Sequence, residues 1–254
     1  MREVKVDTSI IPEALSVYEM GVPEELIWGL AGPNASFCAE ELGKKLSGNQ
    51  MLGAYFIALQ YTKHAYARLG LSQDVFYDTI TCFPRFIEET KRRTGVACFD
   101  RQWWTWRQSS MRLFRFGELE YEFNSPEEIA LHIPSGCDLS KSAIEDSLAK
   151  TRFHIRLYFR EYENAKIVCT SWLLSPELKK MLPASSNILT FQSYFDIKPC
   201  TSPSNDIKAW VFEADEDIPI EKLKEETTLQ RNLKSYLLNG NEFFDGFGIL
   251  KLNY

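Results

Sequence analysis

The sequence predicts an α+β/α/β protein, in which a helical N-terminal domain precedes a domain with a mixed β-sheet flanked by helices. The composition is that of an ordinary globular chain, because 44% of the 254 residues are hydrophobic and 25% are charged. Up to about Arg107, apolar residues recur at the spacing of helices, whereas beyond it alternating segments interleave with helical ones. We therefore predict two domains, residues 1–110 and residues 111–254.

The N-terminal domain is predicted to consist of several short helices. One of them is indicated by apolar residues that recur every three or four positions, namely Met51, Ala54, Tyr55, Ala58 and Leu59. Pro23 followed by two acidic residues is typical of a helix start. Gly70 and Gly95 follow helical runs and are predicted to end them.

The C-terminal domain is predicted to begin with a β-hairpin. Residues Leu113–Phe123 alternate between apolar and polar on both sides of Gly117, which suits a tight turn. One face of the second strand is acidic and consists of Glu118, Glu120 and Glu122. We therefore expect this strand to be solvated on one side.

The later elements are predicted from helix-capping residues, a strand-ending proline and the spacing of apolar residues. Glu128–Ile133 is a predicted strand that ends at Pro134, because proline cannot donate to a β-ladder. Ser140 is a predicted N-cap for a helix that reaches about Phe159. Further predictions are strands over Lys166–Leu174, Ile207–Phe212 and Phe247–Leu252, helices that start at Ser175 and span Ser186–Phe195, and a capping box at Thr227–Gln230.

Charge and composition argue against several classes of function. The formal net charge of −6 is unfavourable for an exposed nucleic-acid surface. No stretch reaches the roughly 18 apolar residues of a membrane helix, and the first residues lack the apolar core of a secretory signal. The six cysteines are scattered, and His64, His132 and His154 have no zinc spacing. We expect a soluble cytoplasmic protein with no metal site and no nucleic-acid or membrane partner.

The segment from Glu128 to Ser140 is the most informative for chemistry. A strand that leads through a small-residue loop to a helix N-terminus presents backbone N–H groups and a positive dipole end, which suit a phosphate. Because Pro134 interrupts the ladder, an extended amide ligand could pair there like an added strand. The simpler interpretation, favoured by spacing alone, is that Ser135 and Gly136 only form a turn and Ser140 only caps a helix.

Several segments resemble a family of bacterial acyltransferases, which join a helical N-terminal domain to a domain similar to the GNAT (N-acetyltransferase) fold. The segments are His132–Gly136, Ser171–Leu178, Ser186–Gln192 and Thr227–Arg231, and Leu113–Leu119 fits the strand pair that begins the family's second domain. The resemblance covers most of residues 105–254. The residues before 105 resemble the family only in being predicted as helices. It implies transfer of an acyl group from acyl-CoA, such as acetyl-CoA, to an amine of a small-molecule acceptor.

The resemblance also implies roles for individual residues. The pantetheine arm of CoA would pair with the strand that ends at Ile133 and Pro134, and Tyr194 would be the general acid for the leaving thiolate. The base would be His132, because imidazole titrates near neutral pH, or a carboxylate acting through water, Glu120 or Glu128. The remaining residues implied in cofactor binding are Ser135, Gly136, Ser140, Lys141 and Asn187.

The predicted phosphate loop departs from the family pattern. GNAT enzymes usually carry Gln or Arg and a glycine-rich run there, whereas this chain has no arginine and places Asp138 in the loop. A carboxylate at about 4 Å from a diphosphate costs on the order of 1–4 kcal/mol. The alternative function is therefore a non-catalytic, GNAT-shaped ligand-binding or interaction module.

Two further hypotheses are weaker. Cys137 lies close to His132 in sequence and at a helix start, so the two could form a thiol nucleophile pair, although a small turn residue is the favoured interpretation. Trp103, Trp104 and Trp106 could stack a planar ligand, but we expect them to pack in an interdomain core.

Overall fold

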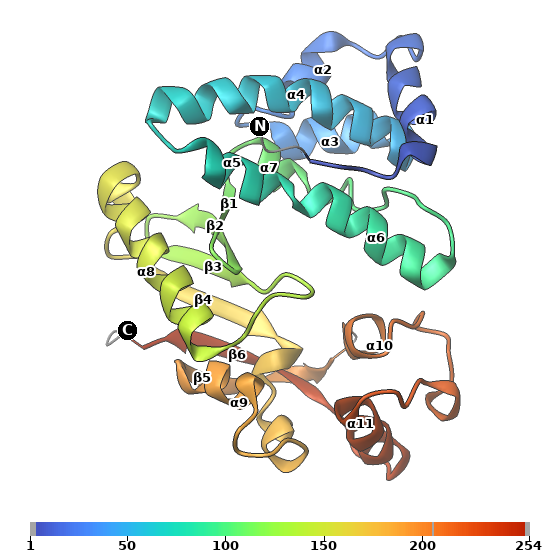
Figure 1. The fold of residues 1–254 in the computed structure, drawn as a ribbon, viewed down its shortest axis with the longest axis vertical. Coiled ribbons are helices and arrows are strands. Elements are labelled where there is room, and N and C mark those ends of the chain that lie inside the picture. The colour runs from blue at the N-terminus through green and yellow to red at the C-terminus, as the bar shows by residue number, and fades with distance from the viewer. Residues whose placement is uncertain (1–3, 205, 252–254) are drawn as a thin grey trace. The chain divides into compact units, whose positions relative to one another are not determined.

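The computed structural model describes residues 4–204 and 206–251 (Figure 1). The α-helices are α1 (Ile11–Leu15), α2 (Glu24–Gly29), α3 (Ala35–Gly43), α4 (Gly48–Leu69), α5 (Gln73–Ile80), α6 (Cys82–Thr94), α7 (Trp106–Ser109), α8 (Lys141–Tyr158), α9 (Asn187–Ser193), α10 (Asp206–Val211) and α11 (Thr228–Leu238). The strands are β1 (Leu113–Phe116), β2 (Leu119–Ser125), β3 (Glu128–His132), β4 (Lys166–Ser171), β5 (Phe195–Pro203) and β6 (Phe244–Leu250). The 3₁₀ helices are η1 (Thr8–Ile10), η2 (Ser16–Glu19), η3 (Arg160–Tyr162), η4 (Trp172–Leu174), η5 (Pro176–Lys180) and η6 (Ile220–Lys222). Within the described ranges, we find no helix whose length and hydropathy would let it span a bilayer.

The chain divides into two compact units that are not contiguous halves of the sequence. One unit comprises the residues up to Phe116 together with Glu120–Asn124 and Phe153–Arg160. The other comprises Gly117–Leu119, Ser125–Arg152 and the chain from Glu161 onward. The chain therefore passes from one unit to the other within β2 and within α8. The boundary that we predict between residues 110 and 111 stays a prediction.

α2 begins directly after Pro23, and α4 and α6 end at glycines, as the sequence predicts. α4 opens with a capping box, in which Ser47 Oγ accepts from Gln50 N and Gln50 Oε1 accepts from Ser47 N. Gly70 ends α4 and Gly95 ends α6, at φ values of 78° and 79° that favour glycine. The local sequence is sufficient to specify these ends, because each cap is made by residues within one turn of the helix.

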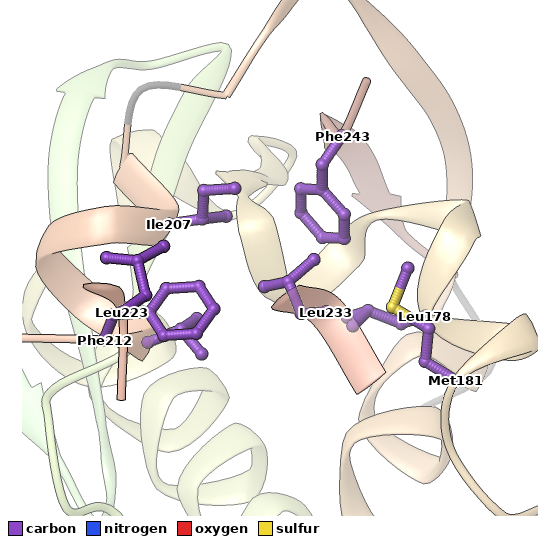
Figure 2. Close-up of a cluster of buried hydrophobic side chains, with 8 residues drawn as sticks. Leu178, Met181, Ile207, Phe212, Leu223, Leu233 and Phe243 are labelled. Atoms are coloured by element: carbon purple, nitrogen blue, oxygen red, sulfur yellow. The ribbon is translucent and has the colours of Figure 1, made fainter. Parts of the chain in front are cut away.

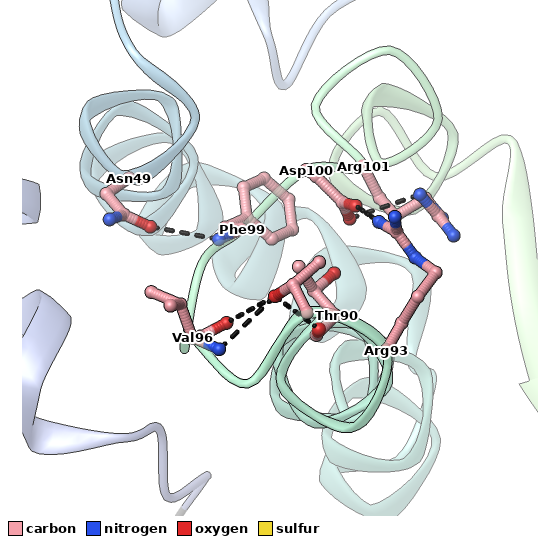
Figure 3. Close-up of polar contacts among 8 residues, drawn as sticks. Asn49, Thr90, Arg93, Val96, Phe99, Asp100 and Arg101 are labelled. Carbon is pink, nitrogen blue, oxygen red and sulfur yellow. Dashed lines mark hydrogen bonds and ion pairs between the residues drawn. The ribbon is translucent and has the colours of Figure 1, made fainter. Parts of the chain in front are cut away.

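A polar cluster fixes the segment between α6 and α7 (Figure 3). Asn49 Oδ1, on α4, accepts a hydrogen bond from Phe99 N at 2.9 Å. Asp100 pairs with Arg93 at 2.9 Å and with Arg101 at 3.1 Å. The Asn49 contact holds the loop against α4, and the Arg93 pair holds it against α6. The Phe99 ring is fully buried between these contacts and the core.

The six strands form one mixed sheet in the order β1-β2-β3-β4-β6-β5. β3 runs parallel to β4, whereas β6 is antiparallel to both β4 and β5. α8 passes in front of β3 and β4 at an angle in Figure 1, and the hydroxyl of its Ser147 accepts from Leu119 N at 3.3 Å. The predicted fold class, a helical region followed by a mixed sheet with flanking helices, is confirmed.

One predicted strand, Ile207–Phe212, is wrong, because these residues form α10 and the turn after it. Ile207 and Val211 lie one helical turn apart and are both buried. With Phe212 they join a cluster contributed by η5, α11 and the segments around them, whose side chains point toward one another in Figure 2. Its members are Leu178, Met181, Ile207, Val211, Phe212, Leu223, Leu233 and Phe243. A run of apolar residues does not by itself distinguish a short buried helix from a strand.

Strand β5 is a second difference, because no sequence pattern predicts it. Its residues are mostly exposed, and it contains Pro199 and Pro203, between which its register against β6 shifts. β5 is the last strand of the sheet. Proline is tolerated there because, on the outer side, no neighbouring strand needs a backbone N–H donor. The closing strand β6 begins at Phe244, earlier than predicted, and its predicted end at Leu252 lies outside the described residues.

The two glutamates of the predicted acidic face that lie in β2 are buried, which contradicts the predicted solvated face, whereas Glu118 precedes β2 and is half-buried. Glu120 and Glu122 are only 3% and 6% exposed. Glu120 Oε1 lies 2.9 Å from Arg85 Nη2, and Glu122 Oε1 lies 3.1 Å from Arg107 Nε and 3.2 Å from Arg112 Nε. Alternation in sequence is the same whether glutamate side chains face water or pair with arginines from other elements, so the sequence could not reveal this arrangement.

Candidate functional site

Strand β3 and helix α8 hold the segment that the sequence singles out. β3 pairs with β4 in parallel from Glu128–Lys166 to Ala130–Val168. β3 itself continues to His132, while β4 goes on along β6 as far as Ser171. Among the described residues, the parallel pairing thus stops before the end of β3. The end of a strand pair is a place where an extended amide ligand can add by strand-like hydrogen bonding.

The loop after β3 turns sharply and leads into α8. Cys137 N donates to Pro134 O at 3.3 Å, and Gly136 has a φ of 73°, in the left-handed region that glycine tolerates. Ile144 N donates to Ser140 O at 3.1 Å, which is the first hydrogen bond of the helix. α8 begins at Lys141, so the predicted helix start is confirmed.

Two carboxylates lie at this helix start. Asp138 Oδ1 accepts from Ser140 N at 2.7 Å, and Asp138 Oδ2 accepts from Ser140 Oγ at 2.9 Å. Glu118 Oε2 in turn accepts from Asp138 N at 3.0 Å. A carboxylate here complements the positive end of the helix dipole, and it also takes the groups of Ser140 that a phosphate would use.

The structure brings two of the predicted site residues together through a residue that the sequence analysis missed. Tyr194 lies between α9 and β5, and its hydroxyl donates to Glu145 Oε1 at 3.3 Å. The same oxygen of Glu145 lies 3.8 Å from Lys141 Nζ, one turn earlier on α8. The i,i+4 spacing of Lys141 and Glu145 is the sequence signal that could have linked them. The predicted acid and a predicted phosphate ligand therefore share one carboxylate.

The other predicted site residues lie apart from this group. His132 is half-buried at the end of β3, and Asn187 is exposed as the first residue of α9. Ile133 and Ser135, in the loop, are half-buried. Glu120 belongs to the other compact unit, where Arg85 pairs with it. The structure thus links Tyr194 to Lys141 through Glu145, and the roles of all the predicted site residues stay predictions.

The remaining histidines and cysteines differ in their surroundings. The ring of His154 stacks on Phe116 with centroids 4.4 Å apart, which makes it part of the packing. Burial raises the pKa of Cys169 to about 12, so this thiol is not an activated nucleophile. Cys137 is half-buried in the loop before α8. The pairing of Cys137 with His132 stays a hypothesis.

The tryptophan cluster is partly a packed stack and partly surface. The Arg107 guanidinium lies 4.1 Å from the ring centroid of Trp104 and 4.5 Å from that of Trp106. The ring of Trp103 lies edge-on to Trp104 at 5.8 Å, and this residue is 61% exposed. Trp104 and Trp106 thus pack around an arginine, whereas Trp103 does not belong to a core.

Comparisons with known proteins agree with the architecture. The GNAT-like C-terminal domain model matches residues 113–250, and the N-acyltransferase N-terminal domain model matches residues 8–111. The search of curated proteins gave no match.

Solved acyltransferase structures share the fold. One in complex with decanoyl-CoA is 23% identical with a TM-score of 0.73, and the match covers 80% of this chain and 65% of that one. One with decanoyl-CoA and teicoplanin, and one with CoA and 10C-teicoplanin, are both 22% identical with TM-scores of 0.72, each covering 79% of this chain and 65% of theirs. This chain therefore spans about two thirds of the length of these acyltransferases. Because the family models together match residues 8–111 and 113–250, the chain belongs to the family that joins an N-acyltransferase N-terminal domain to a GNAT-like C-terminal domain.

Proposed function

We propose that this protein transfers an acyl group from an acyl-CoA thioester to an amine of a small-molecule acceptor. The observation that carries the proposal is the parallel pair β3–β4, whose pairing ends at Ala130–Val168 beside the loop that leads into α8. Such an arrangement offers strand-like pairing for the amides of pantetheine and a helix N-terminus for the diphosphate. Family membership and the acyl-CoA complexes of the structural neighbours support the same donor.

The proposed reaction is direct attack in a ternary complex. The amine nitrogen forms a bond to the thioester carbonyl carbon, the carbon–sulfur bond breaks, and an amide and the CoA thiolate result. His132 is proposed to take the proton that the amine loses, and Tyr194 to give a proton to the departing sulfur. The products are the amide and CoA, so no oxidant or further reactant is needed.

The buried ion pair of Glu120 favours His132 as the base. A base must exchange its proton with the substrate, whereas Arg85 stabilises the charged form of Glu120 inside the protein. We propose that Ile133, Ser135, Gly136 and Lys141 contact the donor, and that Ser140 does so after Asp138 has left it. Asn187 is proposed as a further contact of the donor.

The acceptor is proposed to be an amine on a molecule larger than a free amino acid. Two of the structural neighbours are complexes with teicoplanin and decanoyl-CoA, and with 10C-teicoplanin and CoA. Two others hold decanoyl-CoA and octanoyl-CoA. We therefore propose medium-chain acyl-CoA as well as acetyl-CoA as donors. All six thiols are free, which supports a reducing, cytoplasmic setting.

A specific observation also favours the alternative function, a non-catalytic binding module. Asp138 already takes the backbone N–H and the hydroxyl of Ser140, and Glu118 lies beside it. A diphosphate would have to displace one carboxylate and tolerate another.

Binding and turnover measurements with a series of donors separate the two functions. The melting temperature is measured with acetyl-, octanoyl- and decanoyl-CoA at about 1 mM, because a ligand that binds only the native state raises it. Release of the CoA thiol is then followed with a panel of amine-bearing acceptors that includes a glycopeptide. We expect a rise in melting temperature and acceptor-dependent thiol release. Binding without thiol release would support the module, and absence of both would overturn the acyl-CoA proposal.

A further inference from the structure

We propose that Glu145 is the positioning residue that holds the Tyr194 hydroxyl for protonation of the departing sulfur. This inference rests on the proposed function. It assigns a role to a residue outside the predicted site, on the geometry of α8 and of the junction between α9 and β5.

The main chain of Tyr194 is fixed from both sides. Tyr194 N donates to Phe191 O at 3.2 Å, which closes the last turn of α9, and Tyr194 O accepts from Lys251 N at 2.9 Å. Tyr194 as a whole is 3% exposed, so little freedom remains for the ring. The hydroxyl donates to Glu145 Oε1 at 3.3 Å, and a nearly buried hydroxyl costs free energy unless it has such a partner.

The ion pair between Glu145 and Lys141 does not explain the presence of the carboxylate. Both side chains are exposed and the charged atoms are 3.8 Å apart, and an exposed pair at this spacing contributes little to stability. The contact with Tyr194 joins α8 to the far part of the same unit and is the one that orients a buried group.

Lys141 allows the hydroxyl hydrogen to change partner during the reaction. The Glu145 oxygen that accepts from Tyr194 also lies near the Lys141 ammonium. The ammonium partly balances the charge of this oxygen, so the oxygen holds the hydroxyl hydrogen less strongly. The thiolate that develops as the carbon–sulfur bond breaks carries a negative charge and competes with Glu145 for the same hydrogen. The hydrogen therefore turns from Glu145 to the sulfur, while the ring stays where the main chain holds it.

The test combines replacement of Glu145 with replacement of Tyr194. Glu145→Leu removes the hydrogen-bond acceptor, and we expect kcat to fall about 10- to 100-fold with the KM for acyl-CoA within about twofold of wild type. Glu145→Gln keeps an acceptor oxygen, and we expect it to restore most of kcat. In a Tyr194→Phe background, Glu145→Leu is expected to have no further effect, because Glu145 acts only through the hydroxyl.

The matched control is Asp146→Asn. Asp146 is the next residue on α8 and pairs with Lys150 at 2.6 Å on the helix surface, and we expect wild-type kinetics from it. If wild-type protein turns over acyl-CoA but Glu145→Leu keeps more than half of kcat, or if its loss adds to that of Tyr194→Phe, the positioning role is overturned and the proposed function stands. If wild-type protein shows no turnover, the proposed function fails, and the role of Glu145 fails with it.

Discussion

Asp138 lies at the helix start that we propose as the diphosphate site. Its carboxylate accepts from both the backbone N–H and the hydroxyl of Ser140, at 2.7 Å and 2.9 Å. The sequence shows that an acidic residue is present in this loop, but not that it folds back on the helix start. This is a case in which the residue could be predicted and its conformation could not, because the hydrogen bonds form only once the loop has turned.

Replacement of Asp138 tests whether phosphate binds at this helix start. Asp138→Asn keeps the shape of the side chain and removes a negative charge, so we expect the dissociation constant of CoA to fall about 3- to 10-fold. The measurement is isothermal titration with CoA, with Asp146→Asn as the control that makes the same charge change further along α8. An unchanged affinity in Asp138→Asn would contradict a phosphate site here.

Arg85 and Glu120 form the buried ion pair that the sequence did not reveal. Removal of one partner leaves a buried charge without compensation, so we expect Arg85→Ala to lower the free energy of unfolding by about 3–5 kcal/mol. The measurement is urea denaturation at neutral pH. Lys44→Ala breaks an exposed pair with Glu41 and is expected to change stability by less than about 1 kcal/mol. Equal effects of the two substitutions would contradict the structural role of Arg85.

At the scale of single elements, the predictable features are those made by neighbours in sequence. The capping boxes at Ser47–Gln50 and Thr227–Gln230 place helix starts by short-range hydrogen bonds, and the second of them was predicted from its residues. α10 and β5 were not predictable in the same way. α10 is stabilised as a helix because its apolar residues pack against those of η5 and α11. β5 forms because its backbone pairs with β6.

Strand β6 is expected to be intolerant of a side chain at one position. A Cβ at Gly246 would lie 2.0 Å from Leu174 O, a backbone atom that cannot move aside alone. We expect Gly246→Ala to lower the free energy of unfolding by about 1–3 kcal/mol, as overpacking does. Gly43, in α3, has no atom within 4 Å of such a Cβ, and Gly43→Ala is expected to be neutral or stabilising. Thermal denaturation of both variants measures the difference.

The N-terminal segment is attached by a charged cap. Asp7 accepts from Ser9 N at 3.0 Å and pairs with Lys91 of α6 at 2.8 Å. The hydrogen bonds from Lys91 and Ser9 hold the pKa of the Asp7 carboxyl well below its ordinary value.

The pKa of Asp7 is about 3.9 in the unfolded chain and lower in the folded protein. Asp7 therefore stabilises the fold at pH values above its unfolded pKa, and this effect is lost as the pH falls toward its folded pKa. We therefore expect Asp7→Asn to be less stable than wild type at pH 7 and the difference to shrink below about pH 4. Urea midpoints at pH 7 and near pH 3 check this. A difference that stays constant across this interval would contradict the role of the Asp7 charge.

At the scale of the whole molecule, the sequence predicts two domains but not how the chain is shared between them. Phe114, after the predicted boundary, packs on Tyr66 of α4 with ring centroids 5.6 Å apart. It also packs on Phe159, the residue after α8, at 5.0 Å. These contacts join distant parts of the sequence inside one compact unit. Periodicity describes each segment alone and so cannot show which segments complete a core.

A fragment that ends at the predicted boundary is therefore expected to be incomplete. Residues 1–110 lack Phe114, Phe159 and Glu120, and we expect the fragment to unfold without a cooperative transition. Far-UV circular dichroism during urea denaturation makes the comparison with the full chain. A sharp transition in the fragment, at a denaturant concentration near that of the full chain, would show that the first 110 residues suffice.

The passage of both β2 and α8 from one compact unit to the other has a consequence for inheritance and engineering. A recombination event between related genes at codons 110 and 111 would unite helices from one parent with a Phe114 and a Phe159 from another. Chimaeras of this family should therefore carry the hairpin and the last turns of α8 with the helices of the same parent. Crossovers placed by sequence order alone would separate side chains that pack together in one compact unit.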